Sequence, residues 1–538
     1  MLNLRKIPSR RELKSLEAVG KPCQMPFDSD VLRIVAFSDY RVQDISLLLD
    51  FAKKLQPTPN LILYAGDDVE RFHSGNDNFF EQLAALSTHG LCAVLGNDAG
   101  EDAQAKDGEV RLITDTKTLR AHIRGANVYN VHETPLVLGE YAVIGSEGSP
   151  PDEEFGDMGV VIYNEQSIAR HLQLAAQTAK GKLLILVSHC PPRGVLDLAI
   201  RFGTRRIGSV ALRKFLVPRK NVPLVVCGHV HFCGAQAKKL KRTTVVNAAS
   251  HDDFGAPGRI AIIEIRAGRV CGVQWHNLWE LVSLCGIKES RAARLRDAGI
   301  SNLTQLADAP SECIKQVLKC GAGEVSSMKA RASSLLKQDA IVFKTLGIPD
   351  ENRAYIDIET DPNSEFIWLV GLHVEHESRT YSFFANTPAH EKEMLTELFQ
   401  FLTGRPELQL LAYSNCAIEQ RMLPQRFSAN GLPTVPVEHI RDIYNEIHAC
   451  AAFPVGNTKL KDIARWCGFK ARHPGMGGWV AALSYGSGKP NKRLKQMLLA
   501  YNEDDILSLK QVVKYIESHT QKQAAAANAA SGETLSLF

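Results

Sequence analysis

Short apolar runs recur between about residues 33 and 276, and each run ends in small or polar residues. Runs of this length, bounded by turn residues, are typical of strands that are buried on both faces. Segments with a helical pattern, such as ISLLLDFAKKL and NFFEQLAAL, lie between the runs. This alternation predicts an α/β sandwich over residues 31–277. The runs are RIVAFSD, NLILYAGD, GLCAVLGN, YAVIGSEG, KLLILVSH, VPLVVCGH, TTVVNAA and RIAIIEI.

The pattern changes after this region. The stretch LVSLCGIKESRAARLRDAGISNLTQLADA has a helical pattern interrupted at Gly286 and Gly299, which predicts a small helical connector over residues 278–345. A third unit, assigned to residues 350–519, begins with the predicted strands AYIDIET, IWLVGLHVE and TYSFFAN and continues with helices. Two terminal segments flank these units: residues 1–30 are a basic extension, and residues 520–538 have an Ala-rich, polar composition that predicts a flexible tail.

Composition narrows the class of protein. The chain has 538 residues, of which 45% are hydrophobic, enough for several cores. It contains no apolar run of about 18 residues, and its first residues lack the apolar segment of a secretory signal. The 12 cysteines have no CxxC spacing, which indicates reduced thiols. We therefore expect a cytoplasmic protein with no membrane partner. The net charge of +4 is too small to indicate another partner.

Polar residues follow several predicted strands of the first domain, where strand ends meet at one edge of a sheet. Carboxylate, amide and imidazole groups at one place suit divalent ions such as Mn²⁺, Fe or Zn²⁺. One carboxylate that bridges two ions about 4 Å apart would form a centre that activates water against a phosphate ester. The candidate ligands are Asp39, Asp67, Asn97, His189, His229 and His231.

The order of these residues resembles the calcineurin-like metallophosphoesterases, whose motifs are DxH, GD, GN(H/C), H and GHxH. The resemblance implies that Asp39, Asp67 and His231 hold one metal ion, and that Asp67, Asn97, His189 and His229 hold the other.

Two positions depart from the family pattern. Arg41 replaces the histidine of DxH, and Asp98 replaces the histidine of GNH, which protonates the leaving group in the family. Asp98 is a candidate catalytic residue at that position. A metal-poor domain that survives as a scaffold or binding surface is the alternative.

Basic residues cluster between Arg201 and Arg242, a stretch without Asp or Glu. Because it brackets the loops of His189 and His229, we expect part of it to frame the site and to attract a phosphate backbone. A solvated helix face that lacks acids is the alternative. The candidate nucleic-acid-binding residues are Arg201, Arg205, Arg206, Lys238 and Lys239.

A second group of acids lies in the third unit. Asp357 and Glu359 are two residues apart in AYIDIET and therefore share one face of a strand. Paired buried carboxylates are costly unless a metal neutralises them. Glu419 follows at a predicted helix start, and Tyr501 and Asp505 are one helical turn apart. These groups fit two-metal hydrolysis of a phosphodiester with Mg²⁺ or Mn²⁺, in which the tyrosine orients water.

This arrangement resembles the RNase H-like DEDD 3′–5′ exonucleases of the tyrosine subtype. It is most similar to the predicted-nuclease branch with DIET, an SLKD-like segment (here TKLKDIARWCGF) and YNEDD. The resemblance implies that Asp357, Glu359 and Asp505 bind metal ions and that Tyr501 occupies the YxxxD position. Glu419 stands where other members have Asp. Two further acids, Asp442 and Asp504, have no assigned role.

The connector and the C-terminus carry weaker resemblances. The turn at Gly286 and Lys288 is similar to a helix-hairpin-helix module, which would present backbone N–H groups to a DNA phosphate. A helical spacer or a protein-docking module is the alternative. The C-terminal residues Leu535, Leu537 and Phe538 resemble a bacterial sliding-clamp-binding peptide. A tail that packs on its own domain or is frayed is the alternative.

Together these patterns predict an α/β multidomain chain: a metallophosphoesterase sandwich, a helix-hairpin-helix connector and an RNase H-like domain. We expect a hydrolase, a metal-dependent nuclease acting on DNA, with a 3′–5′ exonuclease centre and a second phosphodiesterase centre, in DNA repair or defence. RNA stays open as a substrate. One alternative is an exonuclease tethered to DNA or a clamp, with an inactive metallophosphoesterase as adaptor. Another is a small-molecule or cyclic-nucleotide phosphodiesterase fused to a nuclease.

Overall fold

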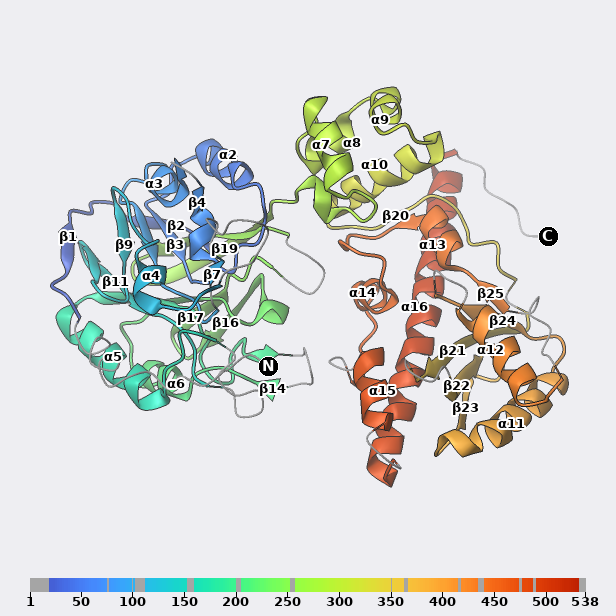
Figure 1. Ribbon diagram of the computed structural model, residues 1–538. Coiled ribbons are helices and arrows are strands. Elements are labelled where there is room, and N and C mark those ends of the chain that lie inside the picture. The colour runs from blue at the N-terminus through green and yellow to red at the C-terminus, as the bar shows by residue number, and fades with distance from the viewer. Residues whose placement is uncertain are drawn as a thin grey trace. The chain divides into compact units, whose positions relative to one another are not determined.

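The computed structural model forms two compact units, one reaching to Ser283 and the other beginning at Leu284 (Figure 1). Four candidate residues, Arg201, Leu535, Leu537 and Phe538, lie outside the residues that the structure describes. The described residues are 19–74, 77–98, 100–101, 112–151, 159–199, 205–251, 257–349, 351–361, 366–414, 418–433, 440–473, 477–486 and 490–531.

Two sheets make up the first unit. One runs in the order β1 (Cys23–Met25), β10 (Leu136–Leu138), β11 (Tyr141–Ser146), β12 (Leu183–Ser188), β15 (Leu224–Cys227), β17 (Thr243–Asn247) and β16 (Gln236–Leu240). The other runs in the order β19 (Arg269–Asn277), β18 (Arg259–Arg266), β2 (Val31–Phe37), β3 (Leu61–Tyr64), β6 (Leu91–Ala93) and β9 (Val128–Asn130). Each apolar run of the sequence contributes a strand, so the predicted sandwich is confirmed.

Central strands such as β3 and β15 are apolar throughout because their two faces contact different cores. Ile34 and Leu63 pack into a cluster that also contains Ile185 and Val226 of the other sheet. Val35 and other alternate residues pack instead into a second cluster that includes buried helix residues. The covering helices are α2 (Ser46–Lys54), α3 (Phe79–Ala84), α4 (Thr116–Arg120), α5 (Glu165–Thr178) and α6 (Val210–Leu216).

Short elements complete this unit. Strand β1 lies within the segment expected as an N-terminal extension, and it pairs in parallel with β10, so the sheet begins before residue 31. The remaining pieces are η1 (Val69–Phe72), β4 (His73–Ser74), β5 (Asp77–Asn78), β7 (Gly100–Glu101), β8 (Leu112–Ile113), β13 (Leu198–Ala199), β14 (Arg205–Arg206), η2 (His231–Cys233) and η3 (Leu281–Ser283).

The second unit begins with the connector, which is helical as predicted. Its helices are α7 (Glu289–Asp297), α8 (Leu303–Asp308), α9 (Ser311–Leu318) and α10 (Ala322–Lys337). The three-residue 3₁₀ turn η3 precedes the turn at Gly286. Helix α10 joins the rest of the unit through the Ser334 hydroxyl, which donates to the carbonyl of Ala452 at 3.2 Å.

A mixed five-stranded sheet organises the rest of the second unit. Its order is β23 (Arg379–Phe384), β22 (Ile367–Val374), β21 (Arg353–Thr360), β24 (Gln409–Ala412) and β25 (Ile440–Asp442). The first three strands pair antiparallel, and β21, β24 and β25 pair in parallel. The other elements are β20 (Ile341–Val342), η4 (Pro388–His390), α11 (Glu391–Thr403), α12 (Ile418–Ala429), α13 (Tyr444–Cys450), β26 (Ala451–Ala452), α14 (Leu460–Trp466), α15 (Gly478–Gly486) and α16 (Lys492–Ser531).

Helix α16 packs along the sheet (Figure 1). Its residues Ile506 and Val512 share a core with Tyr355 and Leu411. It continues to Ser531, whereas the Ala-rich, polar composition from residue 520 predicts a flexible tail. The alanines of this segment have the highest intrinsic helix propensity, which accounts for the longer helix. Among the described residues, no helix is long and apolar enough to cross a membrane.

Candidate active sites

The acids of the first unit lie just beyond the carboxyl ends of two neighbouring strands. Asp39 follows β2 and Asp67 follows β3, and both side chains are buried. Asp39, Asp67, Asp68 and His229 all have left-handed backbone angles, with φ between 49° and 63°. Residues other than glycine rarely adopt this conformation, and clusters of it are found where backbone strain aims functional side chains.

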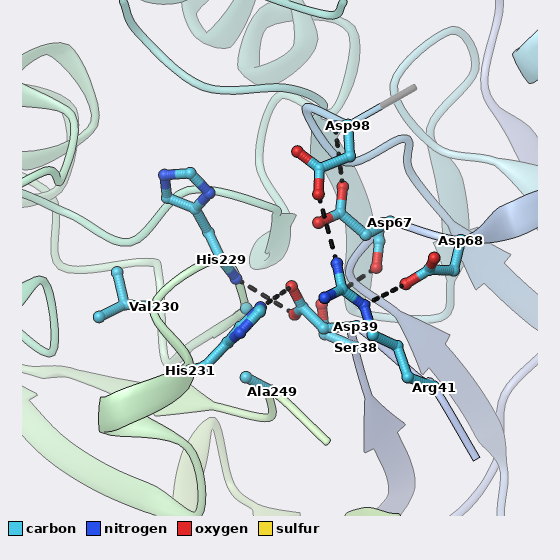
Figure 2. Close-up of polar contacts among 12 residues, drawn as sticks. Ser38, Asp39, Arg41, Asp67, Asp68, Asp98, His229, Val230, His231 and Ala249 are labelled. Carbon is cyan, nitrogen blue, oxygen red and sulfur yellow. Dashed lines mark hydrogen bonds and ion pairs between the residues drawn. The ribbon is translucent and has the colours of Figure 1, made fainter. Parts of the chain in front are cut away.

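Asp39 is held by two histidines of the GHVH motif (Figure 2). His231 Nε2 lies 3.1 Å from Asp39 Oδ1, and the backbone N–H of His229 donates to Oδ2 at 3.2 Å. A Cβ on Gly228 would lie 2.2 Å from Asp39 Oδ2, so the loop needs glycine there to approach. Burial alone would favour the neutral acid, but the hydrogen bond and charge of His231 hold the pKa of Asp39 well below its usual range.

Two hydrogen-bond acceptors face each other near Asp67. His189 Nδ1 lies 2.9 Å from the carbonyl oxygen of Ala65, which can only accept, so Nδ1 carries the proton and Nε2 presents a lone pair. Nε2 lies 2.9 Å from Asn97 Oδ1 and 3.6 Å from Asp67 Oδ2. The Asn97 Nδ2 group donates to Asp98 at 2.8 Å, which fixes the orientation of the amide.

Such facing acceptors repel each other unless a cation lies between them. An amide oxygen, an imidazole nitrogen and a carboxylate together suit a divalent transition ion. Asp39, Asp67 and His189 each offer a ligand atom, and these atoms all lie within 4.8 Å of one another. The rings of His189 and His229 have centroids 5.0 Å apart. The residues of the first centre therefore fit a bound metal ion.

The two residues that depart from the family motif contact each other. Arg41 Nη2 lies 3.3 Å from Asp98 Oδ2, and Arg41 Nε donates to Asp68 Oδ2 at 2.9 Å (Figure 2). The backbone N–H of Asp98 donates to Asp67 Oδ1 at 3.1 Å. Burial opposes the charge of the guanidinium, but the surrounding carboxylates, Asp68 foremost, raise the pKa of Arg41. Arg41 therefore places a permanent positive charge at the centre.

The basic candidates of this unit lie on two strands. Arg205 and Arg206 form β14, where Arg206 pairs with the buried Asp197 at 2.7 Å. This ion pair gives Arg206 a structural role within the unit. Lys238 and Lys239 are exposed on β16, and Lys239 Nζ donates to Thr244 Oγ1 at 2.6 Å.

The structure brings three predicted acids of the second unit together. Asp357 and Glu359 of β21 and Asp505 of α16 each offer an oxygen within 4.8 Å of the others. Burial and the charges of Glu359, Asp505 and Glu419 raise the pKa of Asp357 well above its usual range. Burial and Asp505 likewise raise the pKa of Glu359 to about 8. A cation is the natural partner of such a cluster.

Glu419 is buried, 4% exposed, and among the described residues its Oε2 atom has no hydrogen-bond partner. This orphaned acceptor and the three grouped acids fit divalent metal ions held by oxygen ligands. The other two acids noted in the sequence have structural partners. Asp442 accepts from the Ser414 hydroxyl at 2.9 Å, and Asp504 accepts from Arg472 Nε at 2.8 Å.

Two residues at this site were not found by sequence reasoning. Lys461 Nζ lies 2.9 Å from the Tyr501 hydroxyl and 3.0 Å from Asp505 Oδ1. Asn502 Nδ2 donates to Asp357 Oδ2 at 2.6 Å. Lys461 belongs to the TKLKD segment and Asn502 to YNEDD, so the motifs contained a signal for both. Burial and the charge of Asp505 raise the pKa of Tyr501, which keeps its hydroxyl protonated.

The turn of the connector is exposed at its two candidate residues. Gly286 has φ +93°, and Lys288 is the N-cap of α7. Ile287 between them is 3% exposed and anchors the turn. The backbone is therefore presented to solvent at a helix N-terminus.

Two family models match the chain. The model for calcineurin-like phosphoesterases matches residues 32–233, and that for the RNase H superfamily matches residues 354–517. No curated protein matches. Matching solved structures include TT1561 of Thermus thermophilus, with 20% identity, coverage of 46% of this chain and 99% of that one, and a TM-score of 0.31. The calcineurin-like phosphoesterase YfkN from Bacillus subtilis has 11% identity, coverage of 56% and 100%, and a TM-score of 0.26.

The two family matches confirm the predicted pairing of domains and the α/β multidomain fold class. Both families use divalent metals, and each domain contains a cluster of groups that could hold an ion. The chain thus carries a calcineurin-like phosphoesterase domain and an RNase H superfamily domain, the domains of metal-dependent phosphoesterases and nucleases.

Proposed function

We propose that the chain is a DNA nuclease whose RNase H-like domain removes nucleotides from 3′ ends. The observation that carries this proposal is the cluster of Asp357, Glu359 and Asp505 with the Tyr501 hydroxyl beside it. Its YxxxD arrangement on α16 resembles the tyrosine-type DEDD exonucleases, which supports the 3′–5′ direction.

The side chains have distinct tasks in this proposal. Divalent ions, Mg²⁺ or Mn²⁺, would be held by the three grouped acids and Glu419, and would activate water and neutralise the charge of the scissile phosphate. The Tyr501 hydroxyl, held by Lys461 at 2.9 Å, orients the attacking water. Asn502 fixes the Asp357 carboxylate through its 2.6 Å hydrogen bond.

The first unit is the second phosphodiesterase centre in this proposal. Asp39, Asp67 and His189 supply its core, and the exposed Lys238 and Lys239 add positive charge on the same unit. The exposed turn at Gly286 supports contact with a nucleic-acid backbone. DNA is the proposed polymer, and DNA repair or defence the proposed setting. A sliding clamp bound through the C-terminal residues is a further proposed partner.

A second candidate function makes the first unit an inactive adaptor that brings the exonuclease to DNA. The observation that favours it is Arg41, a residue that cannot bind a metal ion, at a position where the family has a ligand.

Both functions are tested with DNA labelled at the 5′ end, single- and double-stranded, and with matched RNA, in Mg²⁺ or Mn²⁺. Wild type is compared with Asp357→Ala, Asp67→Ala and the double mutant, and Glu312→Ala on exposed α9 is the matched control. We expect Asp357→Ala to abolish stepwise 3′ shortening and Asp67→Ala to remove a separate cleavage pattern. Full 3′ shortening by Asp357→Ala would contradict the exonuclease proposal. Wild-type cleavage by Asp67→Ala on every substrate would favour the adaptor.

A further inference from the structure

The departures at Arg41 and Asp98 form one structural change, because their side chains lie 3.3 Å apart. Arg41 also pairs with Asp68 at 2.9 Å, so two carboxylates hold the guanidinium (Figure 2). Histidine at position 41 would lose this bidentate anchoring, and histidine at position 98 would place an imidazole against a fixed cation. Arg41 and Asp98 are therefore favourable partners, and the substitution at each position suits the substitution at the other.

The two metal positions that the motif implies differ in the protein groups that surround them. At one of them, His189 Nε2 and Asn97 Oδ1 face each other as acceptors at 2.9 Å beside Asp67, an arrangement that requires a cation. The family motif assigns His229 to this position as the fourth ligand, and its ring centroid lies 5.0 Å from that of His189.

At the other position, the groups around Asp39 do not need a cation to balance them. Asp39 Oδ1 lies 3.1 Å from His231 Nε2, a contact between an acceptor and a nitrogen that can donate. Asp39 Oδ2 accepts from the His229 backbone N–H at 3.2 Å, so both oxygens already have protein partners, although one of them lies within 4.8 Å of ligand atoms of Asp67 and His189. The guanidinium of Arg41 has no lone pair to offer, and its charge repels a nearby metal ion.

We propose that the first centre holds a single divalent ion, bound by Asp67, Asn97, His189 and His229, and that Arg41 replaces the other ion as the second positive charge. This inference rests on the phosphodiesterase function proposed above. Arg41 uses Nε and Nη2 for Asp68 and Asp98 in the described contacts, so its Nη1 hydrogens can donate to a phosphate oxygen. Arg41 is thereby a catalytic residue that contacts the substrate phosphate.

Metal counting tests this inference without any need for turnover. The full chain carrying Asp357→Asn and Asp505→Asn, which removes the second cluster, is the parent protein. After equilibrium dialysis against Mn²⁺ we expect one ion per chain by elemental analysis, and a six-line electron paramagnetic resonance spectrum. Adding Arg41→His should raise the count to two and produce the multiline spectrum of an exchange-coupled pair. Arg41→Lys, which keeps the charge, should leave the count at one. Circular dichroism verifies that each variant is folded.

Each other result overturns the proposal. Two ions in the parent would mean that Arg41 coexists with a full two-metal centre. No ion would favour the adaptor instead. One ion in both the parent and a folded Arg41→His variant would mean that Arg41 does not set the count. If Arg41→His does not fold, the number of Mn²⁺ ions bound by the parent protein tests the proposal by itself. Absence of phosphodiesterase activity with one bound ion would contradict the proposed function and leave the metal stoichiometry standing.

Discussion

Asn502 donates a 2.6 Å hydrogen bond to Asp357 across 145 residues of sequence, which ties α16 to the central strand β21. The amide is 1% exposed and adjoins Tyr501, so one short segment of α16 sets the positions of both a carboxylate and a phenol. The acids on the strand and those on the helix therefore form one rigid group.

We expect Asn502→Ala to lower the exonuclease kcat by about 10- to 100-fold, because a hydrogen bond to a charged acid contributes roughly 1.5–3 kcal/mol. The measurement is single-turnover 3′ shortening of labelled DNA at saturating Mg²⁺. Asn386→Ala, on the exposed side of the same domain, serves as the control. Unchanged kcat in the Asn502 variant would mean that Asp357 is positioned without it.

Tyr501 and Lys461 are expected to act as one unit, because Nζ lies 2.9 Å from the hydroxyl and 4.0 Å from the ring centroid. Tyr501→Phe should lower kcat by about 10²-fold, as for other groups that position a reacting proton. Lys461→Met should cause a similar loss, and the double variant should be little worse than either. Multiplicative losses in this double-mutant cycle would show that the two side chains act independently. Lys461→Arg is the matched variant that keeps the charge.

The apolar runs predicted the fold, and the positions of the acids along the chain indicated which of them lie at strand ends, because both depend on local pattern. Strands buried on both faces must be apolar throughout, so RIVAF and LILY stood out, and the polar residues that followed them marked the sheet edge. The alternation of DIET likewise placed Asp357 and Glu359 on one face without knowledge of the fold.

Contacts between distant segments could not be predicted in the same way. The Arg41–Asp98 pair spans 57 residues and depends on how the ends of β2 and β6 meet. The Lys461–Tyr501 contact spans 40 residues and depends on the packing of α14 against α16. A residue type allows such a pair, but only the fold determines which partner is reached. The Ala-rich end of α16 fitted either a helix or a tail, because its composition gives no tertiary signal.

Gly96 is expected to be essential for the first centre. A Cβ at this position would lie 1.7 Å from Asp67 Oδ1, so alanine must displace the carboxylate. Misplacement of a catalytic group by about 1 Å can lower a rate by about 10²-fold. Gly96→Ala should therefore lower cleavage that depends on Asp67 by about 10²-fold and leave 3′ shortening unchanged. Gly272→Ala is the matched control, since a Cβ there has no neighbour within 4 Å. A phosphodiesterase rate that Gly96→Ala leaves unchanged would contradict the assignment of Asp67 to the centre.

His448 is expected to make the second unit sensitive to acid. Burial and the charge of Arg331 lower the pKa of His448 to about 4. The Tyr413 hydroxyl donates to the carbonyl of Thr458 at 2.6 Å, so His448 Nε2 must donate to Tyr413 across their 2.9 Å contact. Protonation then adds a charge at Nδ1 of a ring that is only partly exposed to water. The unfolded chain takes up this proton first, so stability is complete above about pH 6.5 and falls as the pH drops towards 4.

The loss attributable to His448 is about 2–3 kcal/mol between these two pH values, the free-energy equivalent of its pKa shift. His448→Gln keeps a side-chain donor for Tyr413 but does not titrate, so its stability should fall less steeply with acid than that of wild type. Urea unfolding followed by pulsed hydrogen exchange of the α13 peptide measures the difference at pH 4.5 and pH 7. His390→Gln, exposed at η4, is the matched control and should follow wild type. Parallel pH profiles of wild type and His448→Gln would mean that the half-buried imidazole is accommodated in its charged form.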